Sequence, residues 1–336
     1  MPNLRQIIES LLSVVPPIRR LYADNAALSA ENAGLWRSLK EAIGQGGNAI
    51  DGRSYADIAT GQPGPGVPLS AIPPFYILHY KGNAERRRYL EAEFSQYALP
   101  KPELITDFDA GEFSLGDFYT YDETQYRRTV GPISHTMIVP YHIGRVLLPD
   151  ASWVQCFEIY KNLNLDLDQE FNRHPFMKPH PLRSADVSLI LKHRSAWEKI
   201  ANGGSEHVII AEDDVIFFPH SVEYLSWLTA HLPADFDYID LAGGSYLLPR
   251  AGDRQVNDVF FEMIPPRCRT TCCALLSRSF VRRLLALETP ICAPIDWIMN
   301  HDFHVLQAKV YWVHPLVFGH GSVMKVYQSN LRPEAS

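Results

Sequence analysis

The chain has little cysteine and no long apolar run. Only five of its 336 residues are Cys, without the paired spacing of a zinc module or the density of a disulfide scaffold. This usage favours a reducing compartment, so we expect a cytoplasmic protein. No apolar run approaches the ~20 residues that a membrane helix needs, and the first residues lack the pattern of a secretory signal. We expect no transmembrane segment, which leaves contact with a membrane surface open.

Positive charge is also in short supply. Lys and Arg total 31 against 38 Asp and Glu, a net charge of −7. That balance argues against a protein that binds along the phosphate backbone of a nucleic acid, although it leaves room for a local basic site. Hydrophobic residues make up 46% of the chain, which excludes wholesale disorder. At roughly 100 to 200 residues per domain, the length predicts one large domain or two, with appendages.

A short heptad pattern occupies residues 18–43. Leu21, Leu28 and Leu35 are seven positions apart, with Asn25 and Asn32 on the companion seam. Asparagine at such a position fixes register and strand number in parallel coiled coils. The pattern therefore predicts a homo-oligomer formed through residues 18–43. A single amphipathic helix docked on its own domain is the alternative.

Three regions follow from the changes in composition. We expect an N-terminal coiled-coil helix in residues 1–50, a Pro- and Gly-rich linker in 51–74, and an α/β domain in 75–336. In that last region, short apolar runs alternate with helical spacing, which is the α/β signature. The segment 107–183 is harder to interpret, and we expect variable loops that include acceptor-facing surface. The expected strands lie near 75–80, 104–106, 207–211, 238–241 and 272–276, and the expected helices near 83–99, 184–200 and 280–287.

The strongest chemical signal is the segment HVIIAEDDVIFF, in which Glu212, Asp213 and Asp214 end an apolar strand. Ligands bind at such strand ends in open α/β sheets. Strand alternation would direct Glu212 and Asp214 to one face and Asp213 to the other, so the same-face pair could grip a divalent cation. The alternative is an exposed acidic turn.

Several segments in order resemble glycosyltransferase family 25, which contains lipooligosaccharide and collagen galactosyltransferases. They span about 75–331 of the chain. Lys192 stands where the family has Ser, and His79 where it has Asn. The matching segments are YILHYKGNAERRR, SLILKHRSAWEKI, VIIAEDDVIF, FDYIDLAGG, CCALLSRSFVRRLLAL, APIDW and KVYWVHPLVFGHGS.

The resemblance implies a GT-A fold, whose Rossmann-like half binds a nucleotide-sugar through Mn²⁺ or Mg²⁺. Glu212 and Asp214 would hold that ion, which neutralises the charge developing on the nucleoside diphosphate. Asp213 would contact ribose or orient its loop. Arg86 would approach the nucleotide or diphosphate, unless it belongs to a solvated helix face with its Arg neighbours.

Three further residues are candidates. Asp296 lies among apolar residues in PICAPIDWIMNH, which suits a general base for an inverting transfer, whereas the alternative is a helix N-cap. His193 falls on the apolar face of its helix, as a core residue or as part of a nucleotide site. His320, in a Gly-flanked loop, is a candidate metal ligand or an ordinary histidine.

Taken with the resemblance, these residues predict a metal-dependent, inverting hexosyltransferase. It would move galactose or glucose from a UDP-sugar to a hydroxyl of a glycan acceptor, in surface polysaccharide or lipooligosaccharide synthesis. The alternative is a non-catalytic scaffold or nucleotide-sugar-binding module that has the same fold.

Overall fold

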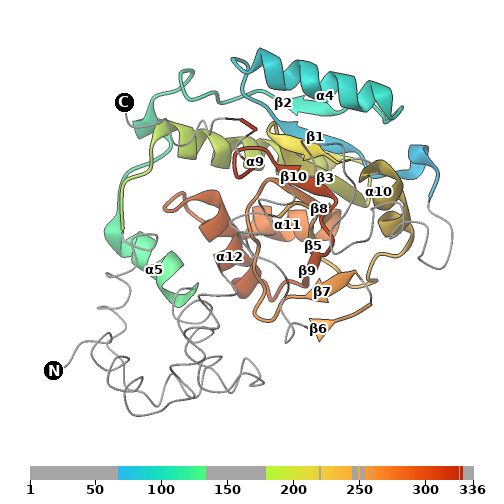
Figure 1. The fold of residues 1–336 in the computed structure, drawn as a ribbon. Coiled ribbons are helices and arrows are strands. Elements are labelled where there is room, and N and C mark those ends of the chain that lie inside the picture. The colour runs from blue at the N-terminus through green and yellow to red at the C-terminus, as the bar shows by residue number, and fades with distance from the viewer. Residues whose placement is uncertain are drawn as a thin grey trace, which may run out of the picture. The chain divides into compact units, whose positions relative to one another are not determined.

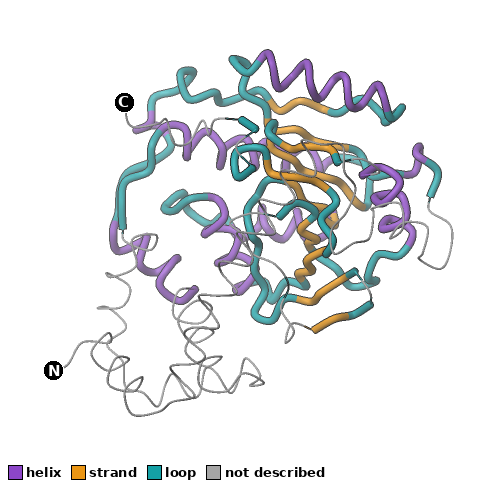
Figure 2. The backbone as a smooth tube through the Cα atoms, viewed as in Figure 1, coloured by secondary structure: helices purple, strands orange, loops and turns teal. Residues whose placement is uncertain are grey.

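The computed structural model describes residues 67–133, 179–218, 221–243, 249, 254–257, 259–324 and 326–327 (Figure 2). The predicted coiled coil, residues 51–66 of the linker and most of 107–183 lie outside these residues. Oligomerisation through residues 18–43 therefore stays a prediction. The described residues fall into two compact units, one containing 121–133 and 179–181, the other 67–120 and 182 onward.

The first of these units contains helix α5, Glu123–Ile133. Its start is stabilised by Asp122, whose Oδ1 accepts hydrogen bonds from the backbone N–H groups of Thr124 and Gln125. This is the ordinary way to satisfy the unpaired donors of a first helical turn.

The second unit is built on a mixed eight-stranded sheet with the order β2-β1-β3-β8-β5-β9-β7-β6 (Figure 1). β1 is parallel to β2 and β3, and β5 is parallel to β9, whereas β8 runs antiparallel between β3 and β5. The α/β class is thus confirmed, with a sheet compatible with a Rossmann-like fold. The main strands are β1 Phe75–Leu78, β2 Glu103–Ile105, β3 His207–Glu212, β5 Tyr238–Asp240, β6 Arg254–Gln255, β7 Phe260–Glu262, β8 Cys273–Ser277 and β9 Val310–Val313.

Helices lie on the sheet, which explains why β3 and β8 are almost wholly apolar. Helix α9 contacts α11, α12 and β1. Elsewhere, Phe75 of β1 packs edge-on against Phe94 of α4, with ring centroids 5.0 Å apart. Phe94 in turn meets Phe217 of a small second sheet, β4 with β10. The bounds are α4 Ala84–Gln96, α9 Ser184–Asn202, α10 Ser221–Ala230, α11 Arg278–Leu287, α12 Ile295–Val305, β4 Val215–Phe217, β10 Phe318–His320, and the 3₁₀ turns η1 Leu69–Ala71 and η2 Leu115–Asp117.

Two local details differ from the sequence-based expectations. The last linker residues are docked, because Val67 and Ser226 of α10 exchange hydrogen bonds through the Val67 N–H and the Ser226 hydroxyl. Strand β3 ends at Glu212, and Asp213 and Asp214 form a turn. Strand alternation therefore does not extend to Asp214, and a shared face for Glu212 and Asp214 does not follow from it.

The chain direction creates a natural ligand position at the end of β1. From β1 the chain passes through α4 to β2 on one side, and later returns through α9 to β3 on the other side. The crevice outside the carboxyl ends of such diverging strands is where open α/β sheets bind ligands.

A separate finding concerns membranes: among the described residues, no helix combines the length and apolar character needed to cross one.

Candidate functional site

Polar side chains from three strands meet at the carboxyl end of β3. His79 follows β1, and the turn of Asp213 and Asp214 follows β3. Because β8 runs antiparallel, its beginning lies at this same edge, and the Glu212 N–H donates to the Cys272 carbonyl over 2.7 Å. The strand directions thus gather carboxylates, an imidazole and a thiol in one region.

Asp213 is the centre of a buried network with the loop after β1. Its Oδ2 accepts from the Tyr80 N–H at 3.0 Å and the Asn83 amide at 3.2 Å. The Nδ1 of His79 lies 2.9 Å from the same oxygen, and Arg86 donates to Oδ1 at 2.5 Å. Burial works to raise the pKa of Asp213, but hydrogen bonds and charge from His79 and Arg86 lower it overall.

Arg86 and Asp213 are thus both buried in this network. Arg86 is only 8% exposed, so the solvated-face alternative is wrong for it, whereas Arg87 and Arg88 are exposed. The guanidinium of Arg86 also lies over the ring of Tyr327, 5.0 Å from its centroid. Asp213 directs Oδ2 to the β1–α4 loop and Oδ1 to Arg86 in the first turn of α4, so it orients that loop against the helix.

Replacing Arg86 with methionine should destabilise the protein by about 3 kcal/mol or more, because the change leaves the Asp213 carboxylate buried without its strongest partner. Arg87→Met is the matched control: Arg87 pairs with Glu91 at the surface, where such pairs contribute up to about 1 kcal/mol. Urea unfolding monitored by circular dichroism measures both. Equal losses for the two variants would show that the buried network contributes no more than a surface pair.

Lys192 connects the ends of β1 and β2. Its ammonium is buried and donates to the His79 carbonyl at 3.0 Å, the Asp107 carbonyl at 2.8 Å and the Asp109 carboxylate at 2.7 Å. All three donors of the ammonium are therefore used. The sequence marks this residue only as a departure from the family pattern, although a lysine on the apolar face of a helix signals a buried partner.

A second cluster consists of Asp214, Cys272 and His320, each with a potential ligand atom within 4.8 Å of the others. The pairing of β10 with β4 places His320 opposite Val215, next to Asp214. The His320 Nε2 lies 3.4 Å from Asp214 Oδ2, and the Cys272 Sγ lies 3.9 Å from Asp214 Oδ1. Asp214 and His320 are among the metal ligands predicted from the sequence, whereas Cys272 is not.

A glycine makes this close approach feasible. The Gly321 N–H donates to the Asp214 carbonyl at 2.8 Å, and a Cβ at Gly321 would lie 2.6 Å from that oxygen. No L-residue with a side chain fits there without a shift of the backbone. Ser322 follows directly, and its N–H donates to Asp214 Oδ2 at 3.1 Å.

The charged groups of this cluster shift one another's pKa values. Burial favours a raised pKa for Asp214, but hydrogen bonds from His320 and Ser322 lower it to about 2. Burial works to lower the pKa of His320, whereas its contact with Asp214 raises it overall. Glu212 is different: burial and the Asp214 charge raise its pKa to about 7. Its Oε1 accepts from the Thr271 hydroxyl at 2.7 Å, and it is outside the 4.8 Å group.

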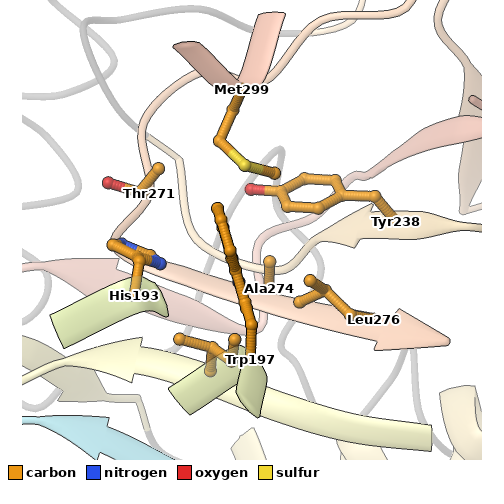
Figure 3. Close-up of a pocket in the computed structure, with 8 residues that line it drawn as sticks. His193, Trp197, Tyr238, Thr271, Ala274, Leu276 and Met299 are labelled. Atoms are coloured by element: carbon orange, nitrogen blue, oxygen red, sulfur yellow. The ribbon is translucent and has the colours of Figure 1, made fainter. Parts of the chain in front are cut away.

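His193 is a core residue beside a small cavity (Figure 3). Burial lowers its pKa to about 3, so the ring is neutral. Its Nε2 and the Trp197 Nε1 are buried without a hydrogen-bond partner. The cavity is of the size that holds a single water. It is lined by His193, Trp197, Ile210, Tyr238, Thr271, Ala274, Leu276 and Met299.

The buried neutral state of His193 predicts acid sensitivity. Its pKa is depressed on folding, so its contribution to stability is present above pH 6.5 and is lost as the pH falls toward 3. The slope is about 1.4 kcal/mol of unfolding free energy per pH unit. His193→Phe should flatten the measured pH dependence by this amount, while the exposed His304→Gln should not. Parallel curves for wild type and His193→Phe would contradict the assignment.

Asp296 lies one residue inside helix α12. The helix begins at Ile295 with Pro294 as its N-cap, so the N-cap interpretation of Asp296 is wrong. The half-buried carboxylate accepts from the Trp297 N–H at 3.0 Å. The Cys268 Sγ lies 3.7 Å from the Asp296 carbonyl, which ties Asp296 to the segment that leads into Cys272.

The same segment carries a buried ion pair that the sequence analysis did not identify. Arg269 and Asp240, at the end of β5, have side chains with no exposed surface and lie 2.7 Å apart. The guanidinium also lies over the Trp312 ring, 4.9 Å from its centroid. Burial raises the pKa of Asp240 despite the nearby Arg269. The pair fixes the chain just before Cys272.

No family model matches the sequence, and no curated protein matches it. The chemistry of the site therefore has to be inferred from the residues described above.

Proposed function

We propose that the protein is a cation-dependent glycosyltransferase with a GT-A fold. It transfers a hexose, galactose or glucose, from a UDP-sugar to a hydroxyl of a glycan acceptor with inversion. One observation carries the proposal: Asp214 and His320 meet at the carboxyl end of β3, beside the point where the strand order reverses. The motifs resembling family 25 point to surface polysaccharide or lipooligosaccharide synthesis.

The residues at this edge fit a divalent cation. A carboxylate and an imidazole suit Mn²⁺ and other transition-metal ions, while the neighbouring thiol of Cys272 is a poor ligand for Mg²⁺. Asp214 and His320 would hold the ion. When bound, it would supply positive charge against the departing diphosphate.

The protein's own groups supply the remaining steps. The Asp213 network holds the β1–α4 loop in one conformation, which gives the nucleotide a fixed edge to bind. Asp296 accepts the proton of the acceptor hydroxyl as that oxygen attacks the anomeric carbon. The bond from that carbon to the UDP oxygen breaks on the opposite face, and UDP leaves.

Thermal shift and turnover together test the proposal. UDP-galactose or UDP-glucose with Mn²⁺ or Zn²⁺ should raise the melting temperature and be hydrolysed slowly to UDP, since a true ligand stabilises the native state. ADP-glucose is the matched control, because it tests whether the protein recognises the uracil base of the donor. Stabilisation without any UDP release, with or without glycan acceptors, would support the non-catalytic binding module. No stabilisation by either UDP-sugar would contradict both.

A further inference from the structure

We propose that Cys272 is a metal ligand, and that with Asp214 and His320 it makes this site selective for Zn²⁺ or Co²⁺ over Mn²⁺ and Mg²⁺. The inference deepens the proposed function, because it concerns the same strand end. It does not depend on sugar transfer, since a cation can bind whether or not the protein is a transferase.

The geometry of the three residues is close to that of a metal site. Around a tetrahedral zinc ion, sulfur, nitrogen and oxygen ligands lie about 3.3 to 3.6 Å from one another. The His320–Asp214 contact measures 3.4 Å and the Cys272–Asp214 contact 3.9 Å. The two contacts use different oxygens of Asp214, and the three ligand atoms all lie within 4.8 Å of one another. Side-chain movements of about 1 Å therefore bring them to the spacing of three ligands around a tetrahedral ion.

The surroundings of the thiol are polar, which a simple core cysteine would not need. Its Sγ lies 3.9 Å from both a carboxylate oxygen of Asp214 and the Gly319 carbonyl. Cys272 is fully buried and Asp214 is 4% exposed, whereas the His320 side chain keeps 12% of its surface exposed. The imidazole is thus the most exposed of the three ligand side chains, and an ion would approach past it.

Ligand chemistry then sets the selectivity. Mg²⁺ and Mn²⁺ prefer oxygen ligands, whereas a thiolate selects softer ions such as Zn²⁺ and Co²⁺. Binding replaces the proton of the Cys272 thiol with the metal ion and releases that proton to solvent. The rigid backbone supports the site, because the Asp240–Arg269 pair anchors the segment before Cys272 and Gly321 permits the close contact at Asp214.

Cobalt spectroscopy of the full-length protein tests the inference directly. Titration with Co²⁺ alone, without a nucleotide-sugar, should produce a thiolate-to-cobalt charge-transfer band in the near ultraviolet. Cys272→Ala should abolish the band, and Cys272→Ser provides a second variant that retains a polar group. Cys273→Ala is the matched control, because Cys273 is a neighbouring buried cysteine within β8 itself, paired with Ala211.

Metal affinities give the second measurement. Competition with a chelating dye should show Zn²⁺ binding weakened about 100-fold or more by Cys272→Ala, while Mn²⁺ binding changes by less than about threefold. Absence of the band in the wild-type protein, its survival in Cys272→Ala, or equal losses for both ions would overturn the inference. A normal band in a protein that releases no UDP would uphold this inference and count against the transferase alone.

Discussion

Replacing Asp214 with asparagine should lower cation-dependent sugar transfer by more than about 10³-fold, because the loss of a metal-held charge in the transition state costs several kcal/mol. Asp214 offers the carboxylate of the cluster, with His320 and Cys272 within reach of the same point. Asparagine keeps the shape and an oxygen that can accept from Ser322 N–H. The change removes the negative charge and turns one acceptor oxygen into an amide donor.

The fold should survive this change. Asparagine loses the ion pair with His320, but it also relieves repulsion from Glu212, whose pKa is raised in part by the Asp214 charge. The lowered pKa of Asp214 means that its charged form stabilises the fold, so we expect a melting temperature roughly 5 °C below wild type, with cooperative unfolding retained. The exposed Asp117→Asn is the control for loss of one carboxylate. Transfer with added Mn²⁺ or Zn²⁺ is the measurement, and wild-type turnover by Asp214→Asn would remove Asp214 from the site.

Asp296→Asn should reduce kcat by about 10² to 10⁴, the usual contribution of a general base, with donor affinity unchanged. The amide retains the size of the carboxylate and cannot take the proton. Because Asp296 follows the first residue of α12 and does not cap it, the structural cost should be the modest loss of a negative charge near the helix start, up to about 1 kcal/mol.

The comparison of three quantities separates the roles of Asp296. Steady-state kinetics gives kcat, titration calorimetry with UDP gives donor-site affinity, and a thermal melt gives stability. A fall in kcat alone identifies the base. Full activity in the stable variant would move the base to another carboxylate, and a collapse of all three values would mark Asp296 as structural.

The α/β class and the positions of the main strands follow from the sequence because they depend on local apolar runs. The expected strand at 207–211 is observed at His207–Glu212, and that at 272–276 is observed at Cys273–Ser277. The direction of each strand cannot be predicted in the same way. Nothing in a short apolar run says which way the strand points, so the antiparallel insertion of β8 between β3 and β5 could not be predicted.

That missing direction explains the part of the site that sequence analysis missed. Cys272 comes near Asp214 only because β8 begins where β3 ends. The carboxylates themselves were identifiable, since three adjacent acids after an apolar strand need a local explanation. Which acid faces which partner depended on the turn at Asp213, where period-two alternation stops.

The Asp213 network likewise joins positions that are far apart in the chain. His79 lies 134 positions before Asp213 in the chain, and Arg86 lies 127 positions before it. No local pattern reports such a pairing. A buried Arg in a run of three could be recognised only by the spacing of Arg86 from Leu90 and Phe94, the buried residues of the same helix.

The contact between Tyr119 and Leu182 has a consequence for how the protein can vary. The Leu182 N–H donates to the Tyr119 hydroxyl at 3.1 Å. The chain therefore leaves the sheet-containing unit and re-enters it at two positions that are joined by this hydrogen bond. Loop closure costs only about 0.6 kcal/mol for each doubling of length. Residues 121–181 could therefore be replaced by an insert of another length or sequence. The carboxylates at the end of β3 would keep their positions.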